Sequence, residues 1–153
     1  MRPTLPEYLL ELARVSASRA TCPKRQVGAV VADEHGVVIG TGYNGVPRGI
    51  EHCTDKPCSG VGKAAPHSHQ HCNAVHAEVN ALLTAGHRAR GGYLAVTTSP
   101  CKECAKVIVN AGIKWLIVGE FNRLWDDREA YGTTPKELLL WGGVNLIFCT
   151  EQA

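Results

Sequence analysis

The chain has 153 residues, of which 44% are hydrophobic and 20% charged, and its formal net charge is +2. That length supports one well-cored domain and is short for two, so we expect a single domain over residues 1–153. The basic residues are scattered and lack the dense stripe of a nucleic-acid binder, so a small anionic ligand is favoured over a nucleic-acid partner.

Three features of the sequence indicate a cytoplasmic location. Apolar runs such as GAVVA and WLIV are too short to span a bilayer, and we expect no membrane partner. The N-terminal stretch MRPTLPEYLLELARV has acidic residues among its apolar positions and no cleavage site after it, unlike a signal peptide. Seven cysteines in a reducing compartment are expected to be ligands or buried thiols rather than disulfides.

The first half of the chain is predicted to form a helix, a hairpin and a long loop. Apolar residues at helical spacing predict an amphipathic helix from Pro6 to about Ser18. The run QVGAVVADEHGVVIGTGYN predicts two strands joined at the turn DEHG. Residues from about 45 to 73 are rich in Gly, Pro, His and Cys without regular pattern. A loop of this length is unusual unless it is functional or held by a ligand.

The second half is predicted to alternate helices and strands. A helix from His76 to about Ala85 is followed by a strand in YLAVTTS, and Pro100 is expected to open a helix in PCKECAKVIVNA. A strand in KWLIVGEF, a helix in TPKELLLWGG with Thr134 as N-cap and Pro135 at its first position, and a strand in VNLIFC complete the chain. Alternating βα units predict parallel strands with helices on both faces, and the hairpin adds an antiparallel part. We therefore expect an α/β fold around a mixed five-stranded sheet.

Residues near two of these predicted helix starts have the types that bind catalytic zinc. Cys101 and Cys104 are three apart on the predicted helix, so both sulfurs share a face and can reach one metal, and His76 can supply a third ligand. Three protein ligands leave one position open on tetrahedral zinc, which is typical of a catalytic site. Zinc lowers the pKa of a water in that position to about 7.

Glu78 follows His76 at a spacing where side chains in mid-helix diverge. At a first turn both can reach a site on the helix axis, so we expect zinc off the N-termini of both helices, whose dipoles favour thiolate and hydroxide. Glu78 is then an unligated carboxylate beside the water, placed to carry protons. One alternative is a structural zinc, but such a site does not need an unligated carboxylate. The other is a pair of buried thiols beside a hydrogen-bonded histidine.

The order H-x-E then P-C-x-x-C is the signature of zinc nucleobase deaminases. From about Glu7 to Ile147 the chain also resembles the bacterial and phage deoxycytidylate (dCMP) deaminases, in TCPKRQVGAVV, GYNGVPRGIEHC, HCNAVHAEVNALL and SPCKECAKVIVNAGIKWLIV. The resemblance implies hydrolysis of dCMP to dUMP and ammonia, a step that feeds thymidylate synthesis. It also implies a three-layer α/β/α sandwich of the cytidine deaminase-like kind.

The resemblance assigns roles by position. The catalytic zinc ligands and the proton shuttle are implied to be His76, Cys101, Cys104 and, as shuttle, Glu78. The backbone amide of Ala77 and the carbonyl near Ser99 would hold the edge of the base. Asn44 would bond the sugar, although Asn-Gly is also a plain turn pair. Val27 would flank the base, or could be part of the core.

Members of this family are commonly regulated homohexamers in which dCTP activates and dTTP inhibits. The resemblance implies a triphosphate site near the GYNG loop, with these candidate residues: Tyr43, Gly45, Arg48, Lys24 and Arg25. A cation such as Arg48 in a glycine-rich loop suits phosphate. A solvated surface charge is the alternative for that residue.

A second cluster of candidate ligands surrounds the long loop, and some members of the family carry a second zinc there. A closed structural zinc would stabilise a loop with few apolar residues to bury. The expected ligands are Cys22, Cys53, His71 and, as fourth, Cys58, which His67 or Cys72 could replace. Reduced, uncoordinated thiols are the alternative. Cys149, in the last strand, is expected to be a core thiol.

Several competing functions keep the same chemistry: deamination of a 5-substituted dCMP such as 5-methyl-dCMP, of free cytidine, of a riboflavin-pathway pyrimidine or of a tRNA adenosine. A zinc-stabilised nucleotide-binding regulator without turnover is an alternative of another class, but it would require a defect in the catalytic set, and the sequence has none. The role of Trp125, in FNRLWDDREAYG, stays open between closing over the substrate and lying in a subunit contact.

Overall fold

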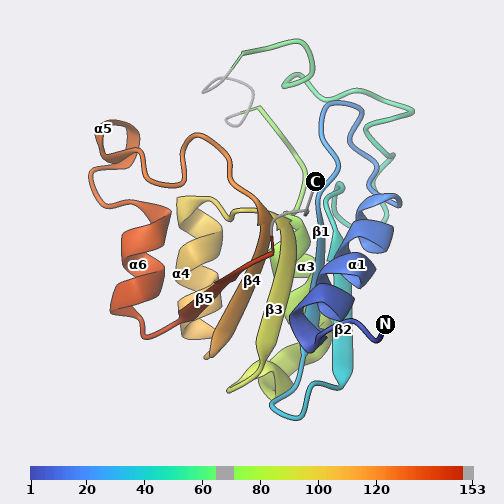
Figure 1. The fold of residues 1–153 in the computed structure, drawn as a ribbon. Helices are drawn as coiled ribbons and strands as arrows, with labels where there is room; N and C mark the ends of the chain where they lie inside the picture. The colour runs from blue at the N-terminus through green and yellow to red at the C-terminus, as the bar shows by residue number, and fades with distance from the viewer. Residues whose placement is uncertain (65–70, 150–153) are drawn as a thin grey trace.

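The computed structural model describes residues 1–64 and 71–149. Its centre is a five-stranded sheet in the order β2-β1-β3-β4-β5 (Figure 1). The strands are β1 (Gly28–Ala32), β2 (Val38–Tyr43), β3 (Tyr93–Thr98), β4 (Trp115–Glu120) and β5 (Asn145–Phe148). β1 is antiparallel to both of its neighbours, whereas β3, β4 and β5 are parallel, which confirms the predicted mixed sheet.

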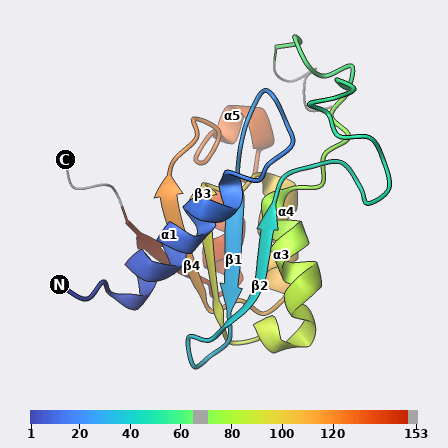
Figure 2. The same cartoon turned by 90° about the vertical axis from the view of Figure 1, so that its right-hand side faces the viewer.

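Helices cover both faces of the sheet. They are α1 (Leu5–Ala17), α3 (Ala77–Ala85), the 3-10 helix η1 (Gly86–Ala89), α4 (Lys102–Asn110), α5 (Arg128–Tyr131) and α6 (Pro135–Trp141). α1 packs on one face, and α3, α4 and α6 pack on the other (Figures 1 and 2). The predicted three-layer α/β/α sandwich is therefore confirmed. No described helix is both long and apolar enough to cross a membrane.

The strand β1 shows how the sequence produces two hydrophobic cores. Every residue of GAVVA is buried, as expected for a strand covered on both sides. Ala29 and Val31 belong to the core beneath α3, whereas Val30 and Ala32 belong to the core beneath α1. The alternation follows from the two-residue period of a strand.

Two glycines of β2 let α3 lie directly on the sheet. A Cβ atom added to Gly42 would lie 2.4 Å from the carbonyl oxygen of Ala77 and 2.5 Å from the amide nitrogen of Ala81. One added to Gly40 would lie 2.5 Å from the carbonyl oxygen of Ala81. These neighbours are backbone atoms that cannot move aside, so Gly42 sets the position of the first turn of α3, which includes Glu78.

Three helix starts differ from those predicted. α3 begins at Ala77, one residue later than expected, because His76 is its N-cap. α1 begins at Leu5 because Thr4 forms a capping box, in which its hydroxyl accepts from the Glu7 amide and the Glu7 carboxylate accepts from the Thr4 amide. The prediction that Pro100 opens α4 is wrong. Cys101 is an extended N-cap whose sulfur accepts a hydrogen bond from the Cys104 amide at 3.5 Å, so the helix begins two residues after the proline.

The long loop lies at the end of the sheet where β3 and β4 finish (Figure 1). Its described residues, 45–64 and 71–73, form turns and bends without a helix or strand, as predicted, apart from a bridge between Gly45 and Val75. α5 lies at the same end, and neither α5 nor η1 was predicted. The N-termini of α3 and α4 meet the long loop at this end of the sheet.

Candidate active site

A compact cluster of His76, Cys101 and Cys104 forms where α3 and α4 begin. His76 is the N-cap of α3 and Cys101 is the N-cap of α4. The Nδ1 atom of His76 lies 3.2 Å from the Cys104 sulfur and 3.5 Å from the Cys101 sulfur, and the three donor atoms lie within 4.8 Å of one another. The two helix N-termini therefore converge on one point, as expected from the sequence, although Cys101 caps its helix instead of sharing a helical face with Cys104.

The donor set fits a zinc ion. Tetrahedral zinc with bonds of about 2.1 Å to nitrogen and about 2.3 Å to sulfur holds these atoms about 3.5 Å apart. The two nitrogen–sulfur distances of the cluster, 3.2 and 3.5 Å, are close to that separation. One imidazole and two thiols leave a fourth position for a small ligand, which is the arrangement of a catalytic zinc site.

Hydrogen bonds inside the cluster already favour one thiolate. The pKa of Cys101 is lowered to about 4, chiefly because the Cys104 thiol donates a hydrogen bond to it and further because of His76. The pKa of Cys104 is raised by the same bond and by burial. The pKa of His76 is raised by its hydrogen bond to Cys101. A preformed thiolate is the ligand that a zinc ion prefers.

Glu78 lies beside the cluster without joining it. Glu78 is buried, with 4% of its surface exposed, and its Oε2 atom lies 3.6 Å from the Cys104 sulfur. Burial raises the pKa of this carboxyl group, because the charged form loses its hydration. Among the described residues no cation forms an ion pair with Glu78, so its carboxyl group can hold or release a proton next to the metal ligands.

Two backbone groups predicted to hold a base lie next to the cluster in sequence and in space. Ala77 is the first residue of α3, where a helix has no internal acceptor for the amide, and it is buried. Ser99 follows β3 and is 3% exposed. Its amide donates to the Glu120 carbonyl at 2.7 Å, and its carbonyl accepts from the Asn122 side chain at 2.8 Å.

Asn44 and Val27 both have structural roles. Asn44 is 9% exposed, and its Oδ1 atom accepts from the Val27 amide at 2.8 Å while its Nδ2 atom donates to the Arg25 carbonyl at 2.9 Å. Val27 is half-buried and packs against the core beneath α3. Asn44 therefore holds the chain before β1, and one of its amide protons remains for another partner. The contact with a sugar stays a prediction.

The residues predicted to bind a triphosphate gather near the same end of the sheet. Three of them are exposed cations: Lys24, Arg25 and Arg48. Of the other two, Tyr43 is the last residue of β2 and Gly45 follows it, and the Tyr43 carbonyl accepts from Asn80 of α3 at 2.9 Å. The positive charge of Arg25 is close enough to oppose protonation of His76. Arg25 thus lies within electrostatic range of the metal ligands.

The cysteines predicted to form a second metal site are partly assembled. Cys53 is buried, and its sulfur accepts from the Cys58 amide at 3.3 Å. Cys22 is close enough to interact electrostatically with Cys53. Across residues 1–64 and 71–149, however, His76, Cys101 and Cys104 form the one group of three ligands within 4.8 Å.

The remaining candidates for that site lie around the loop. The Nδ1 atom of His71 is 3.3 Å from the Ser59 hydroxyl, and the Cys72 sulfur accepts from the Ala74 amide at 3.4 Å. His67 lies outside the described residues. Cys149 is half-buried and packs against the core beneath α1, as predicted for a core thiol.

Three residues of the segment between β4 and α6 make contacts that no sequence motif predicted. Asn122 bonds to Ser99, as above. The phenol of Tyr131 has a raised pKa because it is partly buried and because Cys101 is negatively charged nearby, and the Tyr131 carbonyl accepts from Lys102 at 3.0 Å. Trp125 is 6% exposed and packs into the core beneath α3, so its role is structural.

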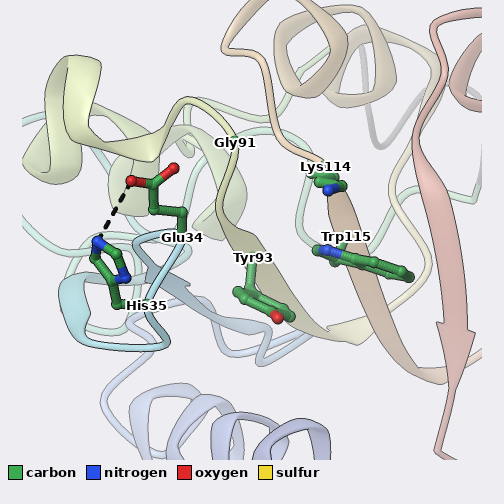
Figure 3. A pocket seen from close by; sticks show the side chains of 6 residues that line it. All are labelled: Glu34, His35, Gly91, Tyr93, Lys114 and Trp115. Atoms are coloured by element: carbon green, nitrogen blue, oxygen red, sulfur yellow. Dashed lines mark ion pairs between the residues drawn. The ribbon is translucent and has the colours of Figure 1, made fainter.

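A pocket at the opposite end of the sheet is separate from this cluster (Figure 3). Its lining residues are Glu34, His35, Gly91, Tyr93, Lys114 and Trp115. The rings of Tyr93 and Trp115 stack with centroids 6.2 Å apart where β3 and β4 begin. The length of β3, about 20 Å, separates them from Ser99. None of the predicted site residues lines this pocket.

The chain is similar to proteins of known activity. Residues 3–120 match the family model described as the cytidine and deoxycytidylate deaminase zinc-binding region. The chain is 39% identical over 134 residues to deoxycytidylate deaminase of Saccharomyces cerevisiae, covering 86% of this chain and 42% of the yeast protein. It is 38% identical over 122 residues to deoxycytidylate deaminase of Mycobacterium phage D29, covering 76% of this chain and 94% of the phage protein.

A solved structure agrees with these similarities. The dCMP deaminase of cyanophage S-TIM5, in complex with dCMP and dUMP, superposes with a TM-score of 0.73 at 26% identity, covering 97% of this chain and 99% of that one. The chain spans less than half of the yeast relative's length but nearly the whole length of both phage proteins.

Proposed function

The chain belongs to the cytidine and deoxycytidylate deaminase family, and on that premise we propose that it is a zinc-dependent enzyme that hydrolyses dCMP to dUMP and ammonia. The observation that carries the proposal is the cluster of His76, Cys101 and Cys104 with the buried Glu78 beside it. A related phage enzyme has been solved with dCMP and dUMP, which supports a deoxynucleotide as the substrate.

The residues at this site have two different roles in the proposed reaction. His76, Cys101 and Cys104 hold the zinc, which when bound supplies a Lewis acid that lowers the pKa of a water molecule to about 7. Glu78 would take a proton from that water and deliver it to N3 of the cytosine ring as the water oxygen adds to C4. It would then take the remaining proton from that oxygen and deliver it to the amine as the bond between C4 and the amine nitrogen breaks. Because Glu78 is buried, bulk water does not compete for this proton.

Backbone groups hold the base in this proposal. The Ala77 amide, which has no acceptor within α3, donates to the edge of the pyrimidine, and the Ser99 carbonyl accepts from its 4-amino group. Asn44 bonds the sugar with its remaining amide proton, and Val27 flanks the base. A pocket formed by fixed backbone groups pays little reorganisation cost when the substrate enters.

An ammonia-release assay tests the substrate. We expect the zinc-loaded protein to deaminate dCMP with a kcat/KM at least about 10-fold above that for cytidine or 5-methyl-dCMP. The reason is that a substrate with a group missing or an extra methyl group fits the pocket less well, which lowers kcat/KM by about that factor or more. A preference for 5-methyl-dCMP would show that the protein is a deaminase of a 5-substituted dCMP. Absence of turnover on all three compounds would instead support a nucleotide-binding regulator.

A second, structural zinc is also part of the proposal, in a single domain whose loop of residues 45–73 it holds. The proximity of Cys53 to Cys58 and Cys22 supports it, with His71 as a further ligand. Such an ion would supply the stability that a loop with few apolar residues lacks. We expect metal analysis of the purified protein to find two zinc ions per chain, and a value of one would remove this second site.

Regulation and assembly complete the proposal. We propose that dCTP activates and dTTP inhibits, through the residues after β2 and the cations Lys24, Arg25 and Arg48, in a cytoplasmic homohexamer. The support is the exposure of these three cations, two of which lie shortly before β1 and one shortly after β2. The ammonia-release assay repeated with each triphosphate, together with a measurement of molar mass in solution, tests both statements.

A further inference from the structure

The residues after β4 hold Ser99 through several hydrogen bonds. The Asn122 amide donates to the Ser99 hydroxyl at 2.9 Å, and the Asn122 side chain donates from Nδ2 to the Ser99 carbonyl at 2.8 Å. The Oδ1 atom of Asn122 in turn accepts from the Leu124 amide at 2.9 Å, which fixes the rotation of the side-chain amide. Asn122 is half-buried, so water competes weakly for these bonds.

The Ser99 peptide needs support from outside its own segment. Pro100 follows it and has no amide proton, so the turn between β3 and α4 lacks one of its usual donors. Cys101 comes next and is a member of the metal cluster. A carbonyl oxygen has two lone pairs, and Asn122 uses one of them. The other remains for a ligand, with its direction set by the bond that Asn122 makes.

We propose that Asn122 is a positioning residue that orients the Ser99 carbonyl so that the site accepts a 4-aminopyrimidine and disfavours the 4-oxo product. This inference rests on the proposed function, which places the amino group of the substrate at that carbonyl. The amino group donates a hydrogen bond there, whereas the product presents an oxygen, and two acceptors facing each other repel. Asn122 therefore contributes to the binding of the substrate through a contact that the product cannot make.

The substitution Asn122→Asp isolates this role. Aspartate has the same shape, can still accept from the Leu124 amide, and leaves the backbone bond to the Ser99 hydroxyl intact. It replaces the donor that faces the Ser99 carbonyl with an oxygen. We expect kcat/KM for dCMP to fall about 10- to 100-fold, as for a polar group left without its partner, while the inhibition constant of dUMP stays within about twofold of wild type. Zinc content should be unchanged.

The chain offers a matched control in Asn145. Its Nδ2 atom donates to the Lys114 carbonyl at 3.1 Å, and it is exposed at the far end of the sheet. Asn145→Asp makes the same chemical change to the same kind of bond, and should leave the constants for both nucleotides unchanged. If Asn122→Asp weakens dCMP and dUMP equally, or weakens neither, Asn122 is merely structural and the proposal is overturned.

Two measurements keep the test decisive. Should Asn122→Asp fail to fold, Asn122→Ala removes the donor without adding a repelling oxygen, and the same ratio of dCMP to dUMP constants decides.

Equilibrium binding of both nucleotides to the zinc-loaded wild-type protein separates this inference from the proposed function. A wild type that neither binds nor deaminates dCMP contradicts the function, whereas a wild-type preference that persists in the variant contradicts the role of Asn122 alone.

Discussion

Replacing Glu78 with glutamine is expected to lower kcat for dCMP about 10³-fold while zinc content and fold stay unchanged. The carboxyl group is buried with Oε2 3.6 Å from the Cys104 sulfur, yet it contributes no atom to the three-ligand group. Glutamine keeps the shape of the side chain but cannot take up and release a proton as a carboxylate does. Steady-state kinetics, metal analysis and a thermal melt of the same preparation check this result.

The matched control for this change is Glu103→Gln. Glu103 neighbours Cys104 on the first turn of α4, but it is exposed and pairs with Lys106 at 2.8 Å. An exposed ion pair contributes little to stability, so this variant should keep wild-type kcat within about twofold. A Glu78→Gln protein with full turnover would exclude Glu78 as the proton carrier. One that loses zinc would show that Glu78 supports a ligand instead.

The order of the elements could be predicted from the sequence because each helix and strand has its own periodicity and its own stop signal. Gly86, for example, ends α3 where it was expected to. The start of α4 could not be predicted from the proline rule, because the Cys101 sulfur takes the place of the usual oxygen at an N-cap. α5 was missed because four residues are too few to show a periodic pattern.

The cluster of His76, Cys101 and Cys104 could be predicted because its residue types and spacings are dictated by zinc, and the structure brings all three together. Asn122 and Tyr131 could not, because they reach the site through contacts between distant parts of the chain. The partner of Asn122 lies 23 residues earlier, and a lone asparagine after a strand has no local signal. Sequence patterns report local chemistry, and these supporting contacts depend on the order of β3 and β4 in the sheet.

The role of Asn44 in the structure could not be predicted from its local sequence. Its place before Gly45 was expected to form either a turn or a contact with the sugar. The structure uses both ends of its side chain on the backbone of Arg25 and Val27. Loss of Asn44 would therefore disturb the start of β1 whatever its role in binding, so an activity measurement on such a variant is informative only beside a stability measurement.

Substituting Cys104 with alanine is expected to abolish turnover and to remove one zinc ion per chain. Cys104 is 2% exposed, and its sulfur lies 3.2 Å from the Nδ1 atom of His76. Without it, His76 and Cys101 alone would have to hold the metal. Loss of a residue that hydrogen-bonds to a metal ligand weakens metal binding about 10- to 100-fold. Loss of a ligand itself should weaken it more. Zinc content per chain and the rate of ammonia release from dCMP measure the effect.

Cys149→Ala is the control, because it makes the same change to a thiol in the core on the other face of the sheet. That variant should keep its zinc and its kcat and lose only the stability of a partly filled core position. If the loop of residues 45–73 binds a second zinc, Cys104→Ala keeps that ion while losing activity, whereas Cys53→Ala loses that ion first. A Cys104→Ala protein with full zinc content and turnover would mean that the chemistry does not take place between the two helix N-termini.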